Sequence, residues 1–589
     1  MAAPGLLRKR DVNPRVFPRI ADPARLHGPV LDRVWDRLRL DFTGIAVAAL
    51  FFCWSLTPSL LPRDWLFQGL IGGINAAIGY AVGVLLSKAA HRWFLNGRRW
   101  WPLPEPWSTG VRVFTVVTSV SVSVVVLVYS AGWQRQIATL MDAEGTTTSG
   151  YIRTGGLSLL VGAAIVLTWR GMREIVRWIA GRLIRRLRLS IPKATTIAVT
   201  VVVVAAVLLV DGVLVRGLYA GTNQIFSLQN ATTRDGAEQP TVPEKSGSPQ
   251  SEAPWDSLGF EGRNFVSRGL DAQELSEVNG RPAKEPIRVY AGLDTAEDSD
   301  SRMDVVIDEL ERTGAFTRSV LVVVPTTGTG WVNPTAAQAI ELVHNGDSAL
   351  VASQYSFLPS WISFLADREK AQAAGRELVH RIHDRWLQEP EATRPKLLVY
   401  GESLGTQAGE GAFDTVADIR DTVDGVLWVG PPNSNRLWSQ LVARRDPGTP
   451  EVDPEYASGL TVRFVDDPGD VHETSGEWLP PRILYVQHPS DPVVWWSPDL
   501  LFTRPDWLKE PPGFDRTASM KWFPFVTFWQ VSADLTNAAG VPDGHGHNYG
   551  TLVLDAWVTV AQPAGWTPAD TERVRDELEA LRDTEGPEK

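Results

Sequence analysis

One serine of the sequence stands where a nucleophile is expected. Residues 401–405 read G-E-S-L-G and lie between a β-branched run, 396–401, and a stretch typical of a helix, 404–414. Such a turn holds the serine in a strained conformation with its hydroxyl exposed, and side chains at both glycine positions would clash. The pattern alone also arises by chance in a chain with 50 glycines. Its place between a strand and a helix therefore favours Ser403 as a nucleophile.

A serine nucleophile needs a base, and the base needs an orienting carboxylate. When the serine sits on a strand–helix turn, the acid and then the histidine follow it along the chain. Asp491 lies in H-P-S-D-P just past the run 482–488, so it is the candidate acid. The alternative is that Asp491 only caps a turn before proline.

Two histidines compete for the role of base in the loop P-D-G-H-G-H-N-Y-G, residues 542–550. His547 is favoured because it stands closer to the apolar helix expected at 551–561, and His545 is the reserve. The H-x-H spacing, with Asp543 nearby, is also compatible with a metal. Because spacing indicates no further ligand, we expect neither a metal nor a cofactor.

An oxyanion needs two backbone amides, one of them from the residue after the nucleophile, which is Leu404. The second is expected in the loop P-T-T-G-T-G-W, residues 325–331, where Gly328 allows the backbone to approach a substrate closely. The alternative is that this stretch is a flexible surface loop.

The elements that must position these residues alternate along the C-terminal part. Short runs bounded by Gly and Pro, separated by longer helical stretches, predict βαβ units and a parallel sheet, whose ligands bind beyond the carboxyl ends of the strands. The expected strands are 287–292, 319–325, 349–354, 396–401, 425–430 and 482–488, and the expected helices are 303–313, 335–344, 366–388 and 404–414.

Two stretches, 433–480 and 497–540, are long for plain connections and are expected to form a cap over the site. Ten aromatic residues crowd into 495–529. That density suits an apolar acyl pocket or a surface lying on lipid. The alternative is ordinary core packing within the cap.

The first 216 residues are apolar and basic, and they predict a membrane domain. They carry a net charge of +15, against -26 for residues 217–589. A spanning helix needs about 20 apolar residues. Charge-free runs near this length indicate helices near 42–62, 65–87, 113–134 and 154–169, and a fifth near 194–215 spans if Asp211 lies near its end.

Orientation follows from the basic residues between these runs. With the N-terminus inside, the inner segments 1–41, 88–112 and 170–193 carry 22 Lys and Arg, and the outer loops carry 3. Five spans then place the rest of the chain outside the cytoplasm. We therefore expect a multi-pass protein of the cytoplasmic membrane, with a cytoplasmic N-terminal segment, 1–41, and a catalytic domain on the outer side.

The domain organisation that results is a transmembrane part, 42–216, a linker and lead-in, 217–284, and a catalytic domain, 285–589. Within the linker, 228–256 is rich in Ser, Pro, Thr and Glu, which is typical of a flexible tether. The acidic C-terminal part argues against nucleic-acid binding. The single cysteine, Cys53, excludes an internal disulfide framework. Nothing in the sequence indicates an oligomeric state.

The order and placement of Ser403, Asp491 and the histidine in G-H-G-H-N-Y resemble the α/β-hydrolase superfamily over roughly residues 285–565. With its N-terminal spans, the chain as a whole resembles a bacterial family of membrane-anchored α/β-hydrolases. The resemblance implies a serine hydrolase or acyltransferase that forms an acyl-enzyme, and it implies no particular substrate.

Three functions remain open at this point. The first is a serine hydrolase of an acyl ester, lipidic because the site stays near the bilayer and the cap is aromatic. The second is an acyltransferase that uses the same residues on an envelope acceptor. The third is a membrane scaffold or transport-associated protein with a hydrolase-like domain that does not turn over. The intact Ser, Asp and His candidates argue against the third.

Overall fold

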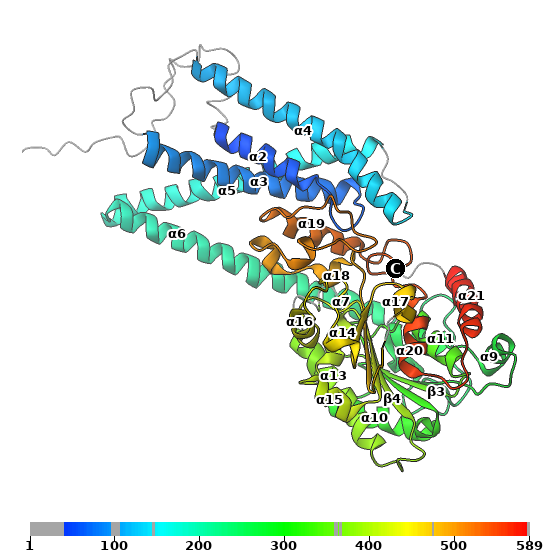
Figure 1. Cartoon of the computed structure of the whole chain (residues 1–589). Coiled ribbons are helices and arrows are strands. Elements are labelled where there is room, and N and C mark those ends of the chain that lie inside the picture. Colours follow the sequence, from blue (N-terminus) through cyan, green and yellow to red (C-terminus); the bar gives the residue numbers. More distant parts are fainter. Residues whose placement is uncertain are drawn as a thin grey trace, which may run out of the picture. The chain divides into compact units, whose positions relative to one another are not determined.

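The C-terminal part of the chain is built around one sheet of seven parallel strands in the order β1-β3-β2-β4-β5-β7-β6 (Figure 1). The computed structural model describes residues 40–95, 107–143, 148–358, 363, 368–473 and 476–585. The expected segment 1–41 thus lies almost wholly outside the described residues. The strands are β1 (Ile287–Ala291), β2 (Val320–Pro325), β3 (Ser348–Ser353), β4 (Lys396–Glu402), β5 (Gly425–Val429), β6 (Val462–Val465) and β7 (Arg482–Val486).

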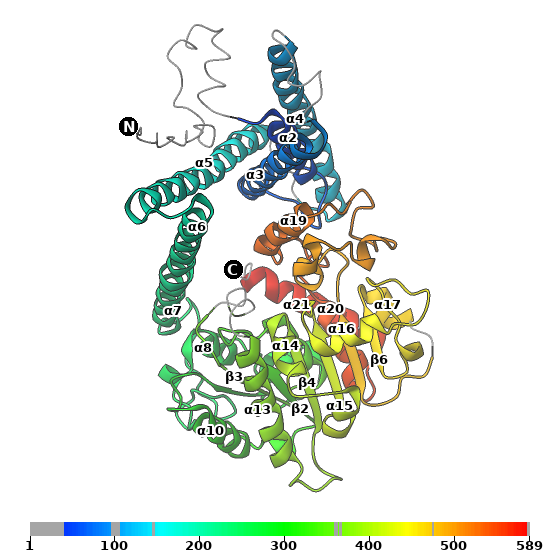
Figure 2. The same ribbon diagram turned by 90° about the vertical axis from the view of Figure 1, so that its left-hand side faces the viewer.

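Helices cover both faces of this sheet, as expected for strands whose residues are buried on both sides. Helices α10, α13, α15 and α16 pack on one face, and α8, α9, α11, α20 and α21 pack on the other. Figure 2 views the molecule from the α13 side. The bounds are α8 (Gly259–Ser267), α9 (Ala272–Asn279), α10 (Ser299–Arg312), α11 (Pro334–Val343), α13 (Arg368–Trp386), α14 (Leu404–Glu410), α15 (Val416–Thr422), α16 (Arg436–Ala443), α17 (Pro468–Glu473), α18 (Pro492–Trp495), α19 (Val526–Asp534), α20 (Leu552–Ala561) and α21 (Pro568–Glu585).

The fold class expected from the sequence is confirmed, and all six expected strands are present. The stretch 433–480, expected to belong to a cap, instead supplies the seventh strand, β6, which pairs with β7 at the sheet edge. The stretch 497–540 contains α19 and short 3-10 turns, including η10 (Leu535–Asn537). Its tryptophans and those just before it largely pack into the core: Trp495 and Trp507 are buried, whereas Phe502 is 70% exposed. Core packing therefore accounts for most of the tryptophans but not for the whole aromatic density.

Most of the described residues of the N-terminal part are helical. Four helical segments are long and apolar enough to cross a bilayer: Trp65–Trp93, Gly110–Leu140, Gly150–Leu187 and Ile191–Gly212. They indicate a membrane protein. The helices are α2 (Phe42–Ser55), α3 (Trp65–Ala90), α4 (Trp107–Leu140), α5 (Thr148–Leu187), α6 (Ile191–Val207) and α7 (Arg216–Asn230), with π-helical turns at His91–Leu95 and Leu208–Val215.

The first expected span is shorter in the structure than the apolar run suggests. Helix α2 has 14 residues, which is about 21 Å, whereas the hydrocarbon core is about 30 Å thick. The helix ends at Ser55, just before Pro58 and Pro62, which remove backbone donors and block helical geometry. Residues 56–64 form a loop instead. The outer placement of the catalytic domain, which depends on five spans, stays a prediction.

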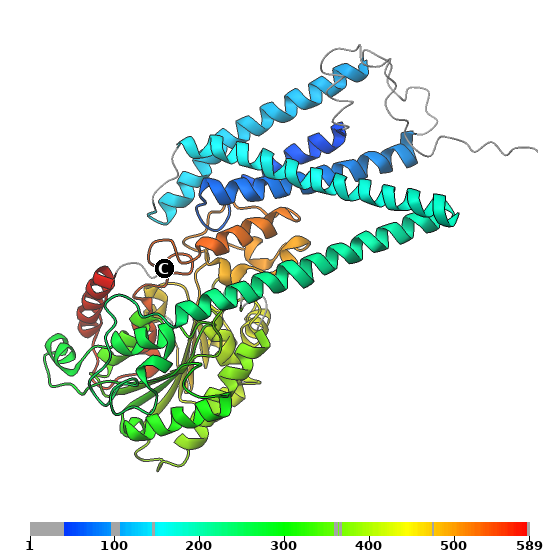
Figure 3. The ribbon, with the colours of Figure 1, turned by 180° about the vertical axis from the view of Figure 1, so that it is seen from behind.

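Two other segments differ from the expectation. The basic stretch after residue 169, expected to be a loop, continues α5 as far as Leu187, and α5 and α6 then form a helical hairpin (Figure 3). The expected tether, 228–256, is packed against β1: Ser246 donates from its backbone to Arg288, and its hydroxyl donates to the buried carboxylate of Glu309 at 2.7 Å. The part of the expected tether around Ser246 is therefore held in the fold rather than flexible.

The chain divides into two compact units. One comprises residues 1–53 and 76–125, and the other comprises residues 54–75 and 126–589. The loop 56–64 and the first turns of α3 thus belong to the same unit as the sheet.

Candidate functional site

Ser403 occupies the turn between β4 and α14 in a strained conformation, with φ 56° and ψ -126°. A non-glycine residue in such a region costs about 1–3 kcal/mol and persists only where its surroundings enforce it. Here the two glycines make the turn possible. A Cβ on Gly401 would lie 2.7 Å from the Gly405 carbonyl oxygen, and one on Gly405 would lie 2.6 Å from the Pro325 carbonyl oxygen. The backbone amide of Ser403 donates to Val429 at 2.9 Å, which ties the turn to the end of β5.

His547 lies next to the end of that same strand. Gly430 directly follows β5 and adopts a φ of +57°, and a Cβ there would lie 2.4 Å from His547 Cε1. The imidazole therefore packs against the backbone of Gly430, the residue after Val429, which accepts the Ser403 amide. Its Nδ1 is 2.6 Å from Asp491 Oδ2. The Nε2 atom is buried and has no hydrogen-bond partner among the described residues.

Asp491 is fully buried and accepts three hydrogen bonds. Besides His547, it accepts one from the Tyr549 hydroxyl at 2.7 Å and one from the Val493 amide at 2.8 Å. The bond from the Val493 amide caps the N-terminus of α18. Asp491 is therefore a capping residue as well as the partner of His547: its Oδ1 accepts the amide, and its Oδ2 faces the histidine. With Asp491 as acceptor, Nδ1 of His547 carries a proton and Nε2 is left to accept one.

The electrostatics at His547 favour its charged form. Burial alone would lower the pKa of His547, but the charge and hydrogen bond of Asp491, with the charge of Glu402, outweigh burial and raise the pKa above its ordinary value. The group can thus hold a proton taken from a neighbouring hydroxyl.

His545, the reserve candidate, points to a different carboxylate. Its Nδ1 is 3.3 Å from Asp515 Oδ2, and Asp515 also accepts a hydrogen bond from Ser490. The Ser490 hydroxyl in turn accepts the amide of Gly546 at 2.8 Å, and His488 Nδ1 lies 2.9 Å from the Gly546 carbonyl. The structure therefore brings His547, and not His545, to Asp491. The pair of His545 and Asp515, through Ser490, holds the backbone of Gly546 next to His547.

The two backbone amides expected to bind the oxyanion belong to a helix and to a buried loop. Leu404 is the first residue of α14, so its amide has no acceptor within the helix. Gly328 is buried, and a Cβ there would lie 2.3 Å from the Leu358 carbonyl oxygen. Thr326 donates to Ser353, and Tyr290 donates to Gly330. The alternative of a flexible surface loop at 325–331 is therefore wrong.

Glu402, next to the nucleophile candidate, is a buried carboxyl that sequence reasoning missed. It accepts hydrogen bonds from Tyr400 at 2.5 Å and from Asn333 Nδ2 at 2.7 Å. Burial raises its pKa, although the charge of His547 and these two hydrogen bonds act in the opposite direction. Because Asn333 also caps α11, Glu402 links the nucleophile turn to the end of the 325–331 loop. The motif G-x-S-x-G leaves this position open, so only its charge could have drawn attention to it.

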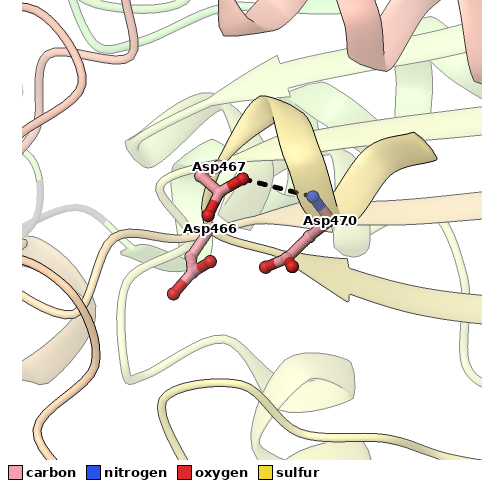
Figure 4. A group of neighbouring side chains, drawn as sticks. All are labelled: Asp466, Asp467 and Asp470. Carbon is pink, nitrogen blue, oxygen red and sulfur yellow. Dashed lines mark hydrogen bonds between the residues drawn. The ribbon is translucent and has the colours of Figure 1, made fainter. Parts of the chain in front are cut away.

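A cluster of three carboxylates lies just beyond β6, from Asp466, Asp467 and Asp470 (Figure 4). Their oxygens lie within 4.8 Å of one another, which would suit a cation. However, burial first, then a hydrogen bond to Asp470 and neighbouring like charges, raise the pKa of Asp466 to about 9. With no ion bound, Asp466 thus keeps its proton at neutral pH. Asp543, the metal ligand considered with the two histidines, instead pairs with Arg582 at 2.7 Å.

Comparison with known families agrees with this architecture. Residues 287–574 match the model of an alpha/beta-hydrolase family, and residues 56–269 match the model of the N-terminus of an alpha/beta-hydrolase family. The chain thus belongs to the α/β-hydrolases, in the family whose members carry this N-terminal region. No curated protein and no solved structure matches the chain.

Proposed function

We propose that the protein is a serine hydrolase that cleaves an acyl ester through an acyl-enzyme, with Ser403 as nucleophile, His547 as base and Asp491 as orienting acid. The observation that carries this proposal is the buried pair of His547 and Asp491, with an unbonded Nε2, beside the strand to which Ser403 is hydrogen-bonded. Of the three functions open from the sequence, only catalysis requires this arrangement.

The proposed reaction has two stages. Ser403 Oγ attacks the acyl carbonyl while His547 Nε2 takes its proton, and the amides of Leu404 and Gly328 stabilise the oxyanion. When the tetrahedral intermediate collapses, the leaving alcohol takes the proton from His547, and the acyl group remains on Ser403. Water then attacks the acyl-enzyme, gives a proton to His547 and releases the acid, while Ser403 regains its proton. An acceptor alcohol in place of water would give acyl transfer.

A lipidic or envelope ester is the proposed substrate class. The support is the position of α19 and the residues just before it, which contact the end of α2 and the loop that follows it. Gln530 Nε2 donates to the Thr57 carbonyl at 3.0 Å, and Phe523 stacks on Trp54 at 4.8 Å between ring centroids. Helix α3, which is long and apolar enough to cross a bilayer, begins at Trp65, and we therefore propose that this part of the hydrolase unit lies near a membrane surface.

The test is covalent labelling of the full-length protein in detergent with a fluorophosphonate, beside Ser403→Ala and a second variant, Ser532→Ala. Ser532 is another partly buried serine of the same unit, on α19. The proposal expects labelling of the wild type and of Ser532→Ala, and none of Ser403→Ala. Absence of labelling in folded wild type, or equal labelling of Ser403→Ala, would sink it. Labelled protein would then be screened for hydrolysis of short-chain and long-chain esters, with and without acceptor alcohols.

A further inference from the structure

The loop between α2 and α3, residues 56–64, is part of the hydrolase unit although it connects two apolar N-terminal helices. Leu60 and Leu61 are buried and belong to the same core cluster as Val541 and Trp495. A connection between two membrane helices usually runs over a surface, because its backbone groups need water. The burial of this loop therefore calls for a structural reason.

A buried ion pair fixes the loop to the last residue of α19. Arg63 Nε is 2.6 Å from Asp534 Oδ1, and both side chains are almost fully buried. The other oxygen of Asp534 accepts hydrogen bonds from the Ser59 hydroxyl and from the Leu60 amide, the latter at 3.1 Å. Breaking a buried pair by removing one partner is strongly destabilising, because it leaves a charge uncompensated. These contacts thus fix the loop to the end of α19.

From this contact, one route leads directly to the histidine. Asp534 ends α19, the short turn η10 follows it, and the next residue, Ala538, accepts the backbone amide of His547 at 2.8 Å. The carbonyl that fixes the His547 backbone is therefore only four residues beyond the carboxylate that Arg63 holds.

A second route is a direct contact. Gly546 precedes His547 with a φ of +55°, and a Cβ there would lie 3.2 Å from Leu61 Cδ2 and 2.7 Å from the Ala538 carbonyl oxygen. The side chain of Leu61 therefore packs on the backbone of the residue next to the histidine. Both routes start in the loop 56–64 and end within one residue of His547.

We propose that Leu61 and Arg63 are positioning residues for the general base: the loop between two apolar N-terminal helices holds His547 at the distance and angle that proton transfer from Ser403 requires. This inference rests on the function proposed above. It implies that the contacts that position His547 are incomplete in the chain from residue 285 onward and are supplied by a loop about 480 residues upstream of His547.

The experiment measures the rate of fluorophosphonate labelling against pH, per folded molecule, with the full chain in detergent. The central variant is Leu61→Ala, and the matched control is Leu56→Ala, which removes the same atoms from a side chain that is equally buried in the same loop but lies outside the core cluster of Leu61. We expect labelling at least tenfold slower for Leu61→Ala, with less than a twofold change for Leu56→Ala. Where Leu61→Ala yields no folded protein, Leu61→Val is compared with Leu56→Val.

The ion pair offers an independent arm of the same experiment. Asp534→Asn and Arg63→Met should each slow labelling, whereas Arg63→Lys, which keeps the charge, should restore most of the rate. A purely structural role would lower the melting temperature of these variants and leave the labelling rate and its pH midpoint unchanged in the molecules that remain folded. Equal rates for Leu61→Ala and Leu56→Ala overturn the positioning role alone. Absence of labelling in the wild type overturns the proposed function, and the positioning role with it.

Discussion

Ser403 and its neighbours stand on consecutive elements of one strand–turn–helix unit, whereas His547 stands on a loop whose contacts come from far along the chain. On the nucleophile side, β4, the turn and α14 follow each other within 15 residues, and the close contacts of the turn lie in adjacent strands. On the base side, the partners are Asp491, 56 residues away, Gly430 and the loop 56–64.

The difference in construction has a physical consequence. The nucleophile side is held by the sheet, which forms the most buried part of the molecule and has little freedom to shift. The base side is held by separate contacts from distant parts of the chain, and the neutral hydrogen bonds among them contribute on the order of 1 kcal/mol each. Substitutions on the nucleophile side should therefore damage folding together with activity, whereas substitutions on the base side should damage activity first.

The largest effect on activity is expected from Asp491→Asn. An amide at this position would force the other tautomer of His547, with its proton on Nε2, so that the ring could no longer accept a proton from Ser403. We expect turnover of an ester to fall by about 10³–10⁴-fold with a small change in melting temperature. Steady-state kinetics on purified full-length protein would measure this.

Asp515→Asn is the matched control, because Asp515 is equally buried and pairs with the neighbouring histidine, His545. Its effect should be at least a hundred times smaller than that of Asp491→Asn on turnover. Equal losses for the two variants would contradict the assignment of Asp491 as the acid.

On the nucleophile side, Gly405→Ala should damage both fold and activity. The new Cβ would lie 2.6 Å from a backbone oxygen of Pro325, which cannot move without shifting β2. Overpacking of this kind costs about 1–3 kcal/mol, and the displaced turn should slow fluorophosphonate labelling by about 10–100-fold, as small misplacements at reacting atoms do. Thermal unfolding and labelling would be measured on the same sample.

Gly181→Ala, in the open on helix α5, is the control for the added methyl group, since nothing lies within 4 Å of its Cβ position. It should leave both measurements unchanged or raise stability slightly. If Gly405→Ala behaved like Gly181→Ala, the sterically closed turn at Ser403 would be refuted.

The same contrast explains which features the sequence could predict. The six predicted strands were visible because they are short β-branched runs next to glycines or prolines, and Ser403 was visible because its turn needs a local pattern. Strand β6 was missed because it has only four residues, V-R-F-V, and lies within the stretch 433–480 that was expected to form a cap. Arg463 is accommodated there by stacking over Trp478, 4.7 Å from the ring centroid, which a local pattern cannot reveal.

The contacts that hold the base were not visible for the same reason. Arg63 and Asp534 are separated by 471 residues, and nothing near either residue indicates a partner. Helix α2 also ended earlier than its apolar run suggested, because hydropathy does not register that Pro58 and Pro62 interrupt the backbone. Local sequence thus identifies side chains with the right chemistry, and tertiary packing decides which of two histidines meets the acid.

A moderate effect is expected on the pH dependence. The base must be neutral, so the rate should fall as the pH drops through the pKa of His547, which is raised above its ordinary value of about 6.5. Burial opposes this rise, while Asp491 and Glu402 cause it. Glu402→Gln removes one of the two charges, so the acidic midpoint of kcat/KM should move to lower pH.

Glu410→Gln serves as the control for this shift. Glu410 is also a buried carboxyl on the nucleophile helix, and burial raises its pKa to about 7. It accepts hydrogen bonds from the Leu437 and Trp438 amides and from the Tyr485 hydroxyl, away from His547. It should leave the acidic midpoint in place. A midpoint that stays fixed in Glu402→Gln as well would show that the Glu402 charge does not reach the imidazole.

The smallest effect is expected from His545→Ala, and it sharpens the contrast between the two histidines. His545 contacts Asp515, which steadies Gly546 only through the Ser490 hydroxyl. Losing one such hydrogen bond is worth about 1 kcal/mol, or about fivefold in rate, whereas His547→Ala should abolish measurable turnover. Because both variants remove an imidazole from the same loop, a general loss of loop order would affect them alike. Comparable losses in the two would therefore point to a disordered loop and would contradict the assignment of distinct roles to the two histidines.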